Sequence, residues 1–78
     1  MNLLILSPEK VLLKAEVTAV ELPGSQGRFV VLKNHAPLLT SLDEGSIRCD
    51  KVDGESIHIP VKGGFAQIRD NDITVCVE

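Results

Sequence analysis

Aromatic residues are almost absent from this chain. The 78 residues include two Phe and neither Tyr nor Trp, yet 44% of them are hydrophobic. A folded core must therefore be built from Val, Ile and Leu. The net charge is −3, and proteins that bind nucleic acid need a basic face and aromatic side chains for base stacking. We therefore expect no nucleic-acid partner.

Long hydrophobic runs and metal-binding cysteine motifs are also missing. The apolar run at the N-terminus, residues 3–6, is too short for a signal sequence or a membrane span. Cys49 and Cys76 form neither a metal-binding pattern nor a redox pair. This composition predicts a reduced, cytoplasmic protein without a disulfide, a metal or another cofactor.

Helical periodicity is nearly absent, and alternation of apolar and polar residues takes its place. Short alternating segments are separated by Gly, Pro, Asn and Asp, a pattern typical of β-strands and turns. The expected strands are residues 2–7, 10–17, 17–23, 28–33, 38–42, 46–50, 56–61, 65–70 and 72–78. About eight to ten such strands, spaced by roughly 8–12 residues, indicate an all-β sandwich or barrel. One domain over residues 1–78 follows from the length.

The alternation also predicts which side chains are buried. On one side of the second and third segments it places Thr18, Val20 and Leu22, with Val17 and Ala19 opposite. Towards the C-terminus it buries one face of each strand: Ile47, Cys49, Ile57, Ile59, Val61, Ala66, Ile68, Ile73, Val75 and Val77. Leu38 and Leu39 are adjacent, so alternation is ambiguous there, and we expect them mainly in the core.

The sequence shows no evident group of residues that could form a catalytic site. His35, in the sequence NHAPLLTSL, has no neighbouring side chain that could complete a catalytic or metal site, and His58 lies on a polar strand face. None of the serines occupies a nucleophile-elbow motif. We therefore interpret His35 as a loop residue that contacts its own backbone or a partner protein.

Three short motifs remain. The glycines of GSQG, residues 24–27, lead into a strand rather than a helix, which favours a tight turn over a phosphate site. Gly63 and Gly64 indicate a bend or a close approach of another segment. Asp50-Lys51-Val52 lies near a predicted hairpin tip, and lipoyl or biotinyl carrier domains modify a lysine in such a position. A carrier domain modified on Lys51 is therefore an alternative hypothesis.

Four segments together carry a family resemblance. Residues 7–29, 34–48, 61–68 and 71–78, above all HAPLLTSL and the later GGF, resemble the N-terminal domain of the epsilon subunit of F-type ATP synthase. The resemblance implies a β-sandwich of about ten strands and a non-catalytic central-stalk subunit. Its partners would be the gamma subunit, the membrane c-ring and, transiently, the alpha/beta head. It would help couple proton movement to ATP synthesis at the cytoplasmic side of the bacterial inner membrane, peripherally.

The resemblance also implies contact residues. By position, Ser25, Gln26, Gly27 and Arg28 correspond to the c-ring contact. Ser7, His35 and Thr40 correspond to the gamma-binding side, to which Leu38 and Leu39 would be the apolar contribution if they are not in the core. Departures are Arg28 where Glu is common, Lys33-Asn34 in place of Pro-Gly, and Val30 in place of Gly.

Most members of that family continue into a C-terminal helical hairpin that can inhibit ATP hydrolysis. The expected fold here has no such hairpin. If 78 residues is the natural length, we expect a subunit that couples without the usual inhibitory arm.

Overall fold

The computed structural model describes all residues from Met1 to Glu78 and is built only from β-strands and turns. The eight strands are β1 (Asn2–Leu6), β2 (Val11–Gly24), β3 (Gly27–Leu32), β4 (Leu38–Leu42), β5 (Gly45–Lys51), β6 (Ser56–Val61), β7 (Gly64–Arg69) and β8 (Asp72–Val77). The predicted all-β class is confirmed. The predicted number of about ten is too high, because two expected segments are one strand.

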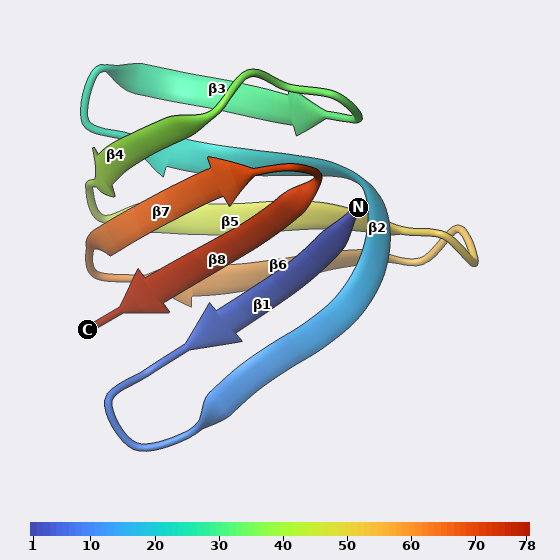
Figure 1. Cartoon of the computed structure of the whole chain (residues 1–78). Helices are drawn as coiled ribbons and strands as arrows, with labels where there is room; N and C mark the ends of the chain where they lie inside the picture. Colours follow the sequence, from blue (N-terminus) through green and yellow to red (C-terminus); the bar gives the residue numbers. More distant parts are fainter.

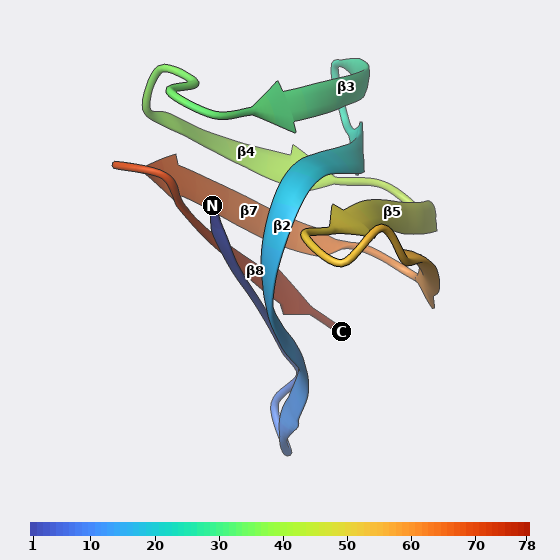
Figure 2. The ribbon, with the colours of Figure 1, turned by 90° about the vertical axis from the view of Figure 1, so that its right-hand side faces the viewer.

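The merged strand is β2, which is 14 residues long and bends through both layers of the molecule (Figures 1 and 2). Its first part pairs with β1, and its second part pairs with β3 and β5. The register against β5 shifts between Val17 and Ala19. Such a bulge bends a strand and lets it change sheets without ending.

The bulge also changes which residues of β2 are buried. Val17 and Val20 are both inaccessible to solvent, whereas simple alternation predicts that they face opposite ways. Thr18 turns outward and donates a hydrogen bond to the carbonyl of Asp50 at 3.3 Å. The predicted faces are therefore correct for Val20 and Leu22 and wrong for Val17 and Thr18.

The strands form two layers of a flattened barrel (Figure 1). One layer contains β4, β7, β8 and β1, where β1 and β8 run parallel and the other pairs are antiparallel. The other contains β3, the second part of β2, β5 and β6. Pairing of β1 with β2 joins the layers on one side, and a single bridge between Gly24 and Leu42 joins them on the other.

The core between the layers is aliphatic and contains no buried polar or charged side chain. Its members come from every strand: Leu3, Ile5, Val17, Val20, Leu22, Val31, Leu42, Ile47, Cys49, Val61, Ala66, Ile68, Ile73, Val75 and Val77. Ile57, Ile59 and Phe29 pack against this cluster while partly buried. The predicted inward faces of β5, β6, β7 and β8 are confirmed.

Leu38 and Leu39 are not in the core, contrary to expectation. Their exposed fractions are 37% and 69%. Adjacent residues of a strand point to opposite faces, so Leu39 points out of the layer beside Gln67. Leu38 shares the inner side with Ile68, but it lies at the start of β4, where it is only partly covered.

Candidate functional site

The residues predicted for the c-ring contact form one compact turn. Ser25 and Gln26 link β2 to β3, and Gly24 pairs with Gly27 across the hairpin. Gly27 has φ of 125°, a conformation that glycine adopts at little cost. A Cβ on Gly24 would lie 2.8 Å from the ring of Phe29. The motif GSQG is thus a tight turn, as predicted.

Hydrogen bonds tie this turn to the neighbouring β4–β5 turn. The backbone N–H of Ser25 donates to the carbonyl of Ser41 at 3.0 Å, and that of Asp43 donates to Pro23 at 2.8 Å. Ser41 Oγ donates to Ser25 Oγ at 2.8 Å, and Ser25 Oγ donates to Asp43 Oδ1 at 3.0 Å. The surface at this end of the barrel is therefore polar, exposed and held in place by two turns.

Arg28 does not present a free charge. Its Nε lies 3.1 Å from Oε2 of Glu21, and Arg48 approaches the other oxygen of Glu21 at 3.9 Å. Arg48 also pairs with Asp50 at 3.4 Å, while its buried Nε makes no hydrogen bond. These ion pairs join three strands across the outside of the β3–β2–β5–β6 layer. Sequence reasoning missed the network because it depends on strand register.

His35 lies in the loop between β3 and β4, at the opposite end of the barrel from the β2–β3 turn (Figure 1). Its Nδ1 is 2.6 Å from the carbonyl oxygen of Ala36, and its side chain is half-buried. No other hydrogen bond of its ring is present. The interpretation of His35 as a loop residue in contact with its own backbone is confirmed.

Ser7 lies in the β1–β2 turn and Thr40 in β4, the strand that follows the His35 loop, and no hydrogen bond joins the three residues. Ser7 stabilises the β1–β2 turn, because its Oγ bonds to the carbonyl of Lys10 at 3.2 Å and accepts from the same residue's N–H at 3.2 Å. Thr40 lies in the middle of β4, opposite Ala66 of β7. The three residues predicted to contact gamma thus lie in a turn, a loop and a strand, and do not line a common pocket.

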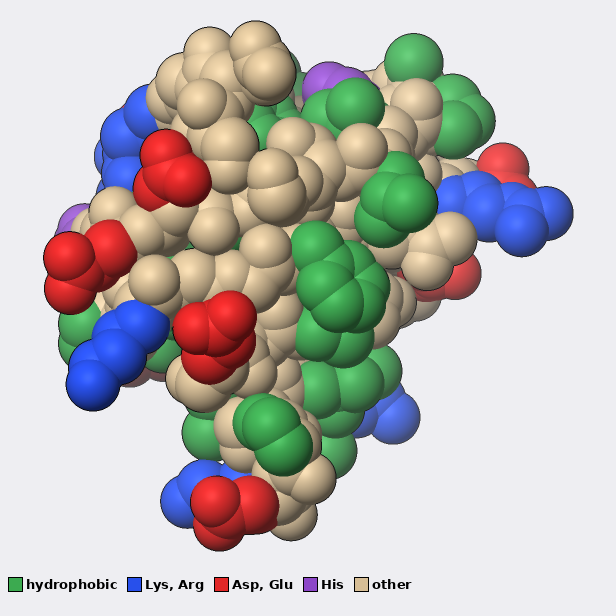
Figure 3. Space-filling view, turned by 90° about the vertical axis from the view of Figure 1, so that its left-hand side faces the viewer, with side chains coloured by type: hydrophobic (Ala, Val, Ile, Leu, Met, Phe, Trp, Pro, Cys, Tyr) green, Lys and Arg blue, Asp and Glu red, His purple; other side chains and the backbone are tan.

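The outer face of the β4–β7–β8–β1 layer carries exposed apolar side chains, of which sequence reasoning missed Phe65. Leu39 and Phe65 are 69% and 49% exposed, and Leu6 and Cys76 continue the same face across the paired strands. An open groove of about 490 Å³ lies beside them, and its lining includes Leu6, Pro8, Phe65 and Val77 together with the charged Glu78. Figure 3 shows hydrophobic side chains in a band between charged groups.

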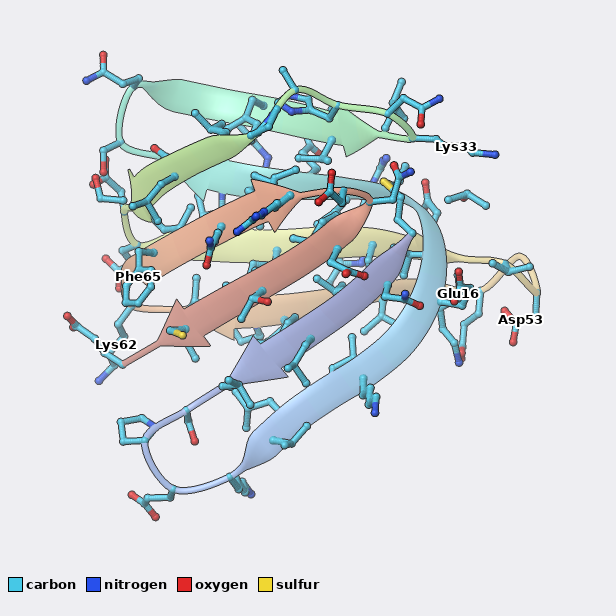
Figure 4. The ribbon with its side chains drawn as sticks, viewed as in Figure 1. Glu16, Lys33, Asp53, Lys62 and Phe65 are labelled. Atoms are coloured by element: carbon cyan, nitrogen blue, oxygen red, sulfur yellow. The ribbon has the colours of Figure 1, made fainter.

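A signal for this face was present in the sequence. Phe65 is one of only two aromatic residues, and it alternates with the inward residues Ala66 and Ile68. An aromatic side chain on the solvent side of a strand indicates contact with another molecule more often than a polar one does. Figure 4 shows Phe65 at the end of the molecule near Lys62, while Lys33 and Asp53 lie at the other end.

Comparison with known proteins places this geometry in a family. The family model described as the β-sandwich domain of the ATP synthase delta/epsilon chain matches residues 1–78. The chain belongs to this family. Its two layers, its hairpin turn at residues 24–27 and its histidine loop are therefore those of a delta/epsilon-family sandwich.

Several relatives are named ATP synthase epsilon chain. Those of Leptospira borgpetersenii and Nitratidesulfovibrio vulgaris are 40% and 41% identical, and each comparison covers 100% of this chain. The chloroplastic relative of Porphyra purpurea is 42% identical over 99% of it. The chain spans 61%, 58% and 57% of the lengths of these three relatives.

Solved structures share the fold. A chain of the mitochondrial ATP synthase of Euglena gracilis superimposes with a TM-score of 0.88 at 23% identity, over 96% of this chain and 48% of that chain. A chain of the Tetrahymena thermophila central stalk and c-ring gives a TM-score of 0.81 at 18% identity, over 99% and 62%. At such identities the likeness concerns the fold.

No group of three His, Cys, Asp or Glu side chains could hold a metal ion. No helix of the fold has the length and apolarity needed to cross a bilayer. Lys51 pairs with Glu55 at 3.3 Å and with Asp53 at 3.9 Å within the β5–β6 hairpin. Nothing in the comparisons supports the carrier-domain alternative.

The two cysteines of the domain differ in environment, and we expect them to differ in reactivity. Burial, together with the nearby carboxylate of Asp50, raises the pKa of the Cys49 thiol, which leaves less of the reactive thiolate at a given pH. Cys76 is only half-buried on the outer face. Iodoacetamide at about pH 8 should label Cys76 at least roughly tenfold faster.

Peptide mass spectrometry after timed quenching measures this difference. In denaturant, where neither thiol is buried, both cysteines should be labelled at similar rates. Equal labelling of Cys49 and Cys76 in the folded domain would contradict the burial of Cys49.

Proposed function

We propose that this chain is a non-catalytic rotor subunit of an F-type ATP synthase, connecting the gamma subunit to the c-ring. The main support for this proposal is that the family match extends over residues 1–78, which include both contact regions described above. In this role the domain helps couple proton translocation to ATP synthesis. It would lie peripherally at the cytoplasmic side of a bacterial inner membrane and meet the alpha/beta head transiently.

Two regions of the surface, which adjoin at Ser41, are proposed for two partners. The polar turn of Ser25, Gln26, Gly27 and Arg28 is proposed to meet the c-ring. The outer face of the β4–β7–β8–β1 layer is proposed to meet the gamma subunit, together with Ser7 and His35 in the flanking turns; Thr40 is on the inner side of β4, opposite Ala66. Interfaces of standard size bury about 800 Å² on each partner, about a sixth of the 4758 Å² that this domain exposes. The exposed area is therefore sufficient for two interfaces of this size.

The electrostatics of the turn limit what Arg28 contributes. Because Glu21 already pairs with Arg28 at 3.1 Å, the guanidinium brings little net charge to a partner. Such a rim charge influences association rate and salt sensitivity more than affinity. The side-chain amide of Gln26 is exposed to form hydrogen bonds with polar loops, whereas the Ser25 hydroxyl is already bonded to Asp43 and Ser41.

Rigidity is the mechanical property that the role requires. A subunit that transmits rotation must keep its two contact surfaces fixed relative to one another. Here one aliphatic core joins every strand, and hydrogen-bonded pairing runs from β1 through β8, β7 and β4 to β2 and back to β1. Close-packed interiors of this kind transmit strain with little deformation.

Co-purification tests the proposal. A tagged copy of the chain, expressed in its own host, should recover the gamma subunit and the c-ring from detergent-solubilised membranes. An untagged strain and a strain carrying the tag on an unrelated small β-sandwich serve as controls. Recovery of the tagged chain without any ATP synthase subunit would refute the proposed function.

His35→Ala should weaken gamma binding without unfolding the domain. The imidazole contacts only the adjacent Ala36 carbonyl, so its removal leaves no buried group unpaired. Loss of one contact at the rim of an interface predicts an increase in Kd of about threefold to fivefold. Isothermal titration with purified gamma subunit measures Kd, and thermal unfolding measures stability. Unfolding of His35→Ala, with normal binding by its folded fraction, would show a structural role instead.

A further inference from the structure

Two asparagines in separate turns adopt left-handed backbone conformations and face one another. Asn34, in the β3–β4 loop, has φ of 66°, and Asn71, in the β7–β8 turn, has φ of 63°. Asn accepts this conformation more readily than other residues with a Cβ. Both turns lie at the end of the barrel that also holds the N-terminus (Figure 1).

The side-chain amide of Asn71 forms two hydrogen bonds with Asn34, one to its backbone and one to its side chain. The backbone N–H of Asn34 donates to Oδ1 of Asn71 at 2.7 Å, and Nδ2 of Asn71 donates to Oδ1 of Asn34 at 3.2 Å. The backbone carbonyl of Asn71 also accepts from the N–H of Asn2 at 3.0 Å. Asn71 therefore joins the loop to the sheet through its side chain and the N-terminal strand to the turn through its backbone.

The two bonds between Asn34 and Asn71 are the only hydrogen bonds that connect the β3–β4 loop to a segment other than its flanking strands. Within residues 33–37, the remaining hydrogen bonds are local: His35 N–H donates to Leu32 at 3.1 Å, and the His35 ring contacts Ala36. The strand before the loop, β3, pairs only with β2. Without the two bonds between Asn34 and Asn71, no hydrogen bond would connect the loop to any segment beyond its two flanking strands.

We propose that Asn71 is a positioning residue for the β3–β4 loop and thereby for His35. Its effect on binding rests on the proposed gamma contact, whereas its effect on the loop does not. The role requires an acceptor facing the Asn34 N–H and a donor facing the Asn34 side chain, which a single primary amide provides. Asp retains only the acceptor at neutral pH, and Gly has neither group.

A series of variants separates the two bonds. Asn71→Gly permits the left-handed backbone and removes both bonds, while Asn71→Asp and Asn34→Gly each remove only the bond to Asn34 Oδ1. Asp70→Asn is the matched control, because Asp70 is in the same turn with φ of 53°, and its side chain makes only an exposed ion pair with Arg69 at 3.7 Å.

Solvent exchange of the Asn34 backbone amide, measured by NMR, reports on the loop without any partner. Asn71→Gly should accelerate it by roughly fivefold, the factor expected for one net hydrogen bond. Asn71→Asp should accelerate exchange of the Asn34 amide less than Asn71→Gly does. In Asn34→Gly the backbone N–H of residue 34 is still the reporter, and its exchange should also change less than in Asn71→Gly. Asp70→Asn should leave exchange unchanged, and core amides of β8 should keep their rates in every variant.

Two results would overturn the positioning role. One is Asn34 exchange in Asn71→Gly within about twofold of the wild-type rate, which would mean that the bond does not hold the loop. The other is equal acceleration at the β8 core amides, which would indicate general destabilisation.

Binding to purified gamma subunit distinguishes this inference from the proposed function. If the wild-type domain binds, Asn71→Gly should raise Kd by about threefold, chiefly through slower association, because a mobile loop must be ordered on binding. Unchanged Kd and association rate in Asn71→Gly would overturn the effect on binding. Failure of the wild-type domain to bind would refute the gamma contact itself, while the exchange result would still decide the loop.

Discussion

Gly64→Ala is expected to lower the free energy of unfolding by roughly 3–5 kcal/mol. Gly64 has φ of 146°, and a Cβ there would overlap the carbonyl oxygen of Cys76 on the neighbouring strand β8. That oxygen belongs to a backbone held between β7 and β1, so it cannot move aside cheaply. A domain of this length has a total stability of about 4–12 kcal/mol, so much of the protein should be unfolded or insoluble.

Gly54→Ala is the matched control for this substitution. Gly54 also has a positive φ, of 95°, but it lies in the β5–β6 hairpin tip and a Cβ there would meet no atom within 4 Å. Gly54→Ala should therefore lower the free energy of unfolding only by the cost of placing a residue with a Cβ in this backbone conformation, about 1–2 kcal/mol. Urea unfolding followed by circular dichroism measures both variants. Similar midpoints for the two would show that the close approach to Cys76 is not what demands glycine at position 64.

Leu22→Ala is the second substitution with a large expected effect, about 2–5 kcal/mol of destabilisation. The Leu22 side chain is 0% exposed, in the part of β2 that pairs with β3. Truncation removes buried apolar surface and leaves a cavity between two layers that cannot close without moving their strands. The unfolding midpoint should fall while the urea dependence of the free energy stays unchanged.

Leu39→Ala provides the comparison with an exposed leucine. Because the Leu39 side chain is 69% exposed on the apolar outer face, its loss should change stability by less than about 0.5 kcal/mol. In the proposed complex, however, it should weaken gamma binding. A destabilisation of Leu39→Ala comparable to that of Leu22→Ala would contradict the position of Leu39 outside the core.

The contrast between these leucines has a functional meaning. Most inward positions are occupied by aliphatic side chains, and eight large apolar residues remain exposed, on β2, β3, β4, β7 and the β5–β6 hairpin. Exposed apolar groups reduce solubility unless a partner covers them. Leu39 and Phe65 are the two that lie on the outside of the β4–β7–β8–β1 layer, where the proposed gamma contact would cover them.

Much of the architecture could be predicted because it depends on local rules. Alternation correctly identified the inward residues of β5 to β8, and Gly, Asn and Asp correctly marked the turns. Prediction failed where neighbouring strands decide the outcome. The bulge at Val17 merged two expected segments into β2, and the adjacent Leu38 and Leu39 offered no alternation from which burial could be inferred.

For the candidate site, the sequence by itself determined which residues resemble contact positions and that His35 has no chemical partner nearby in the chain. Period-two patterning and turn chemistry act over a few residues, so they can be read directly. Only the tertiary structure decided that Arg28 is paired with Glu21 and that Asn34 is bonded to Asn71, 37 positions away in the chain. Such contacts depend on strand register and on the bend of β2, which are properties of the whole sheet.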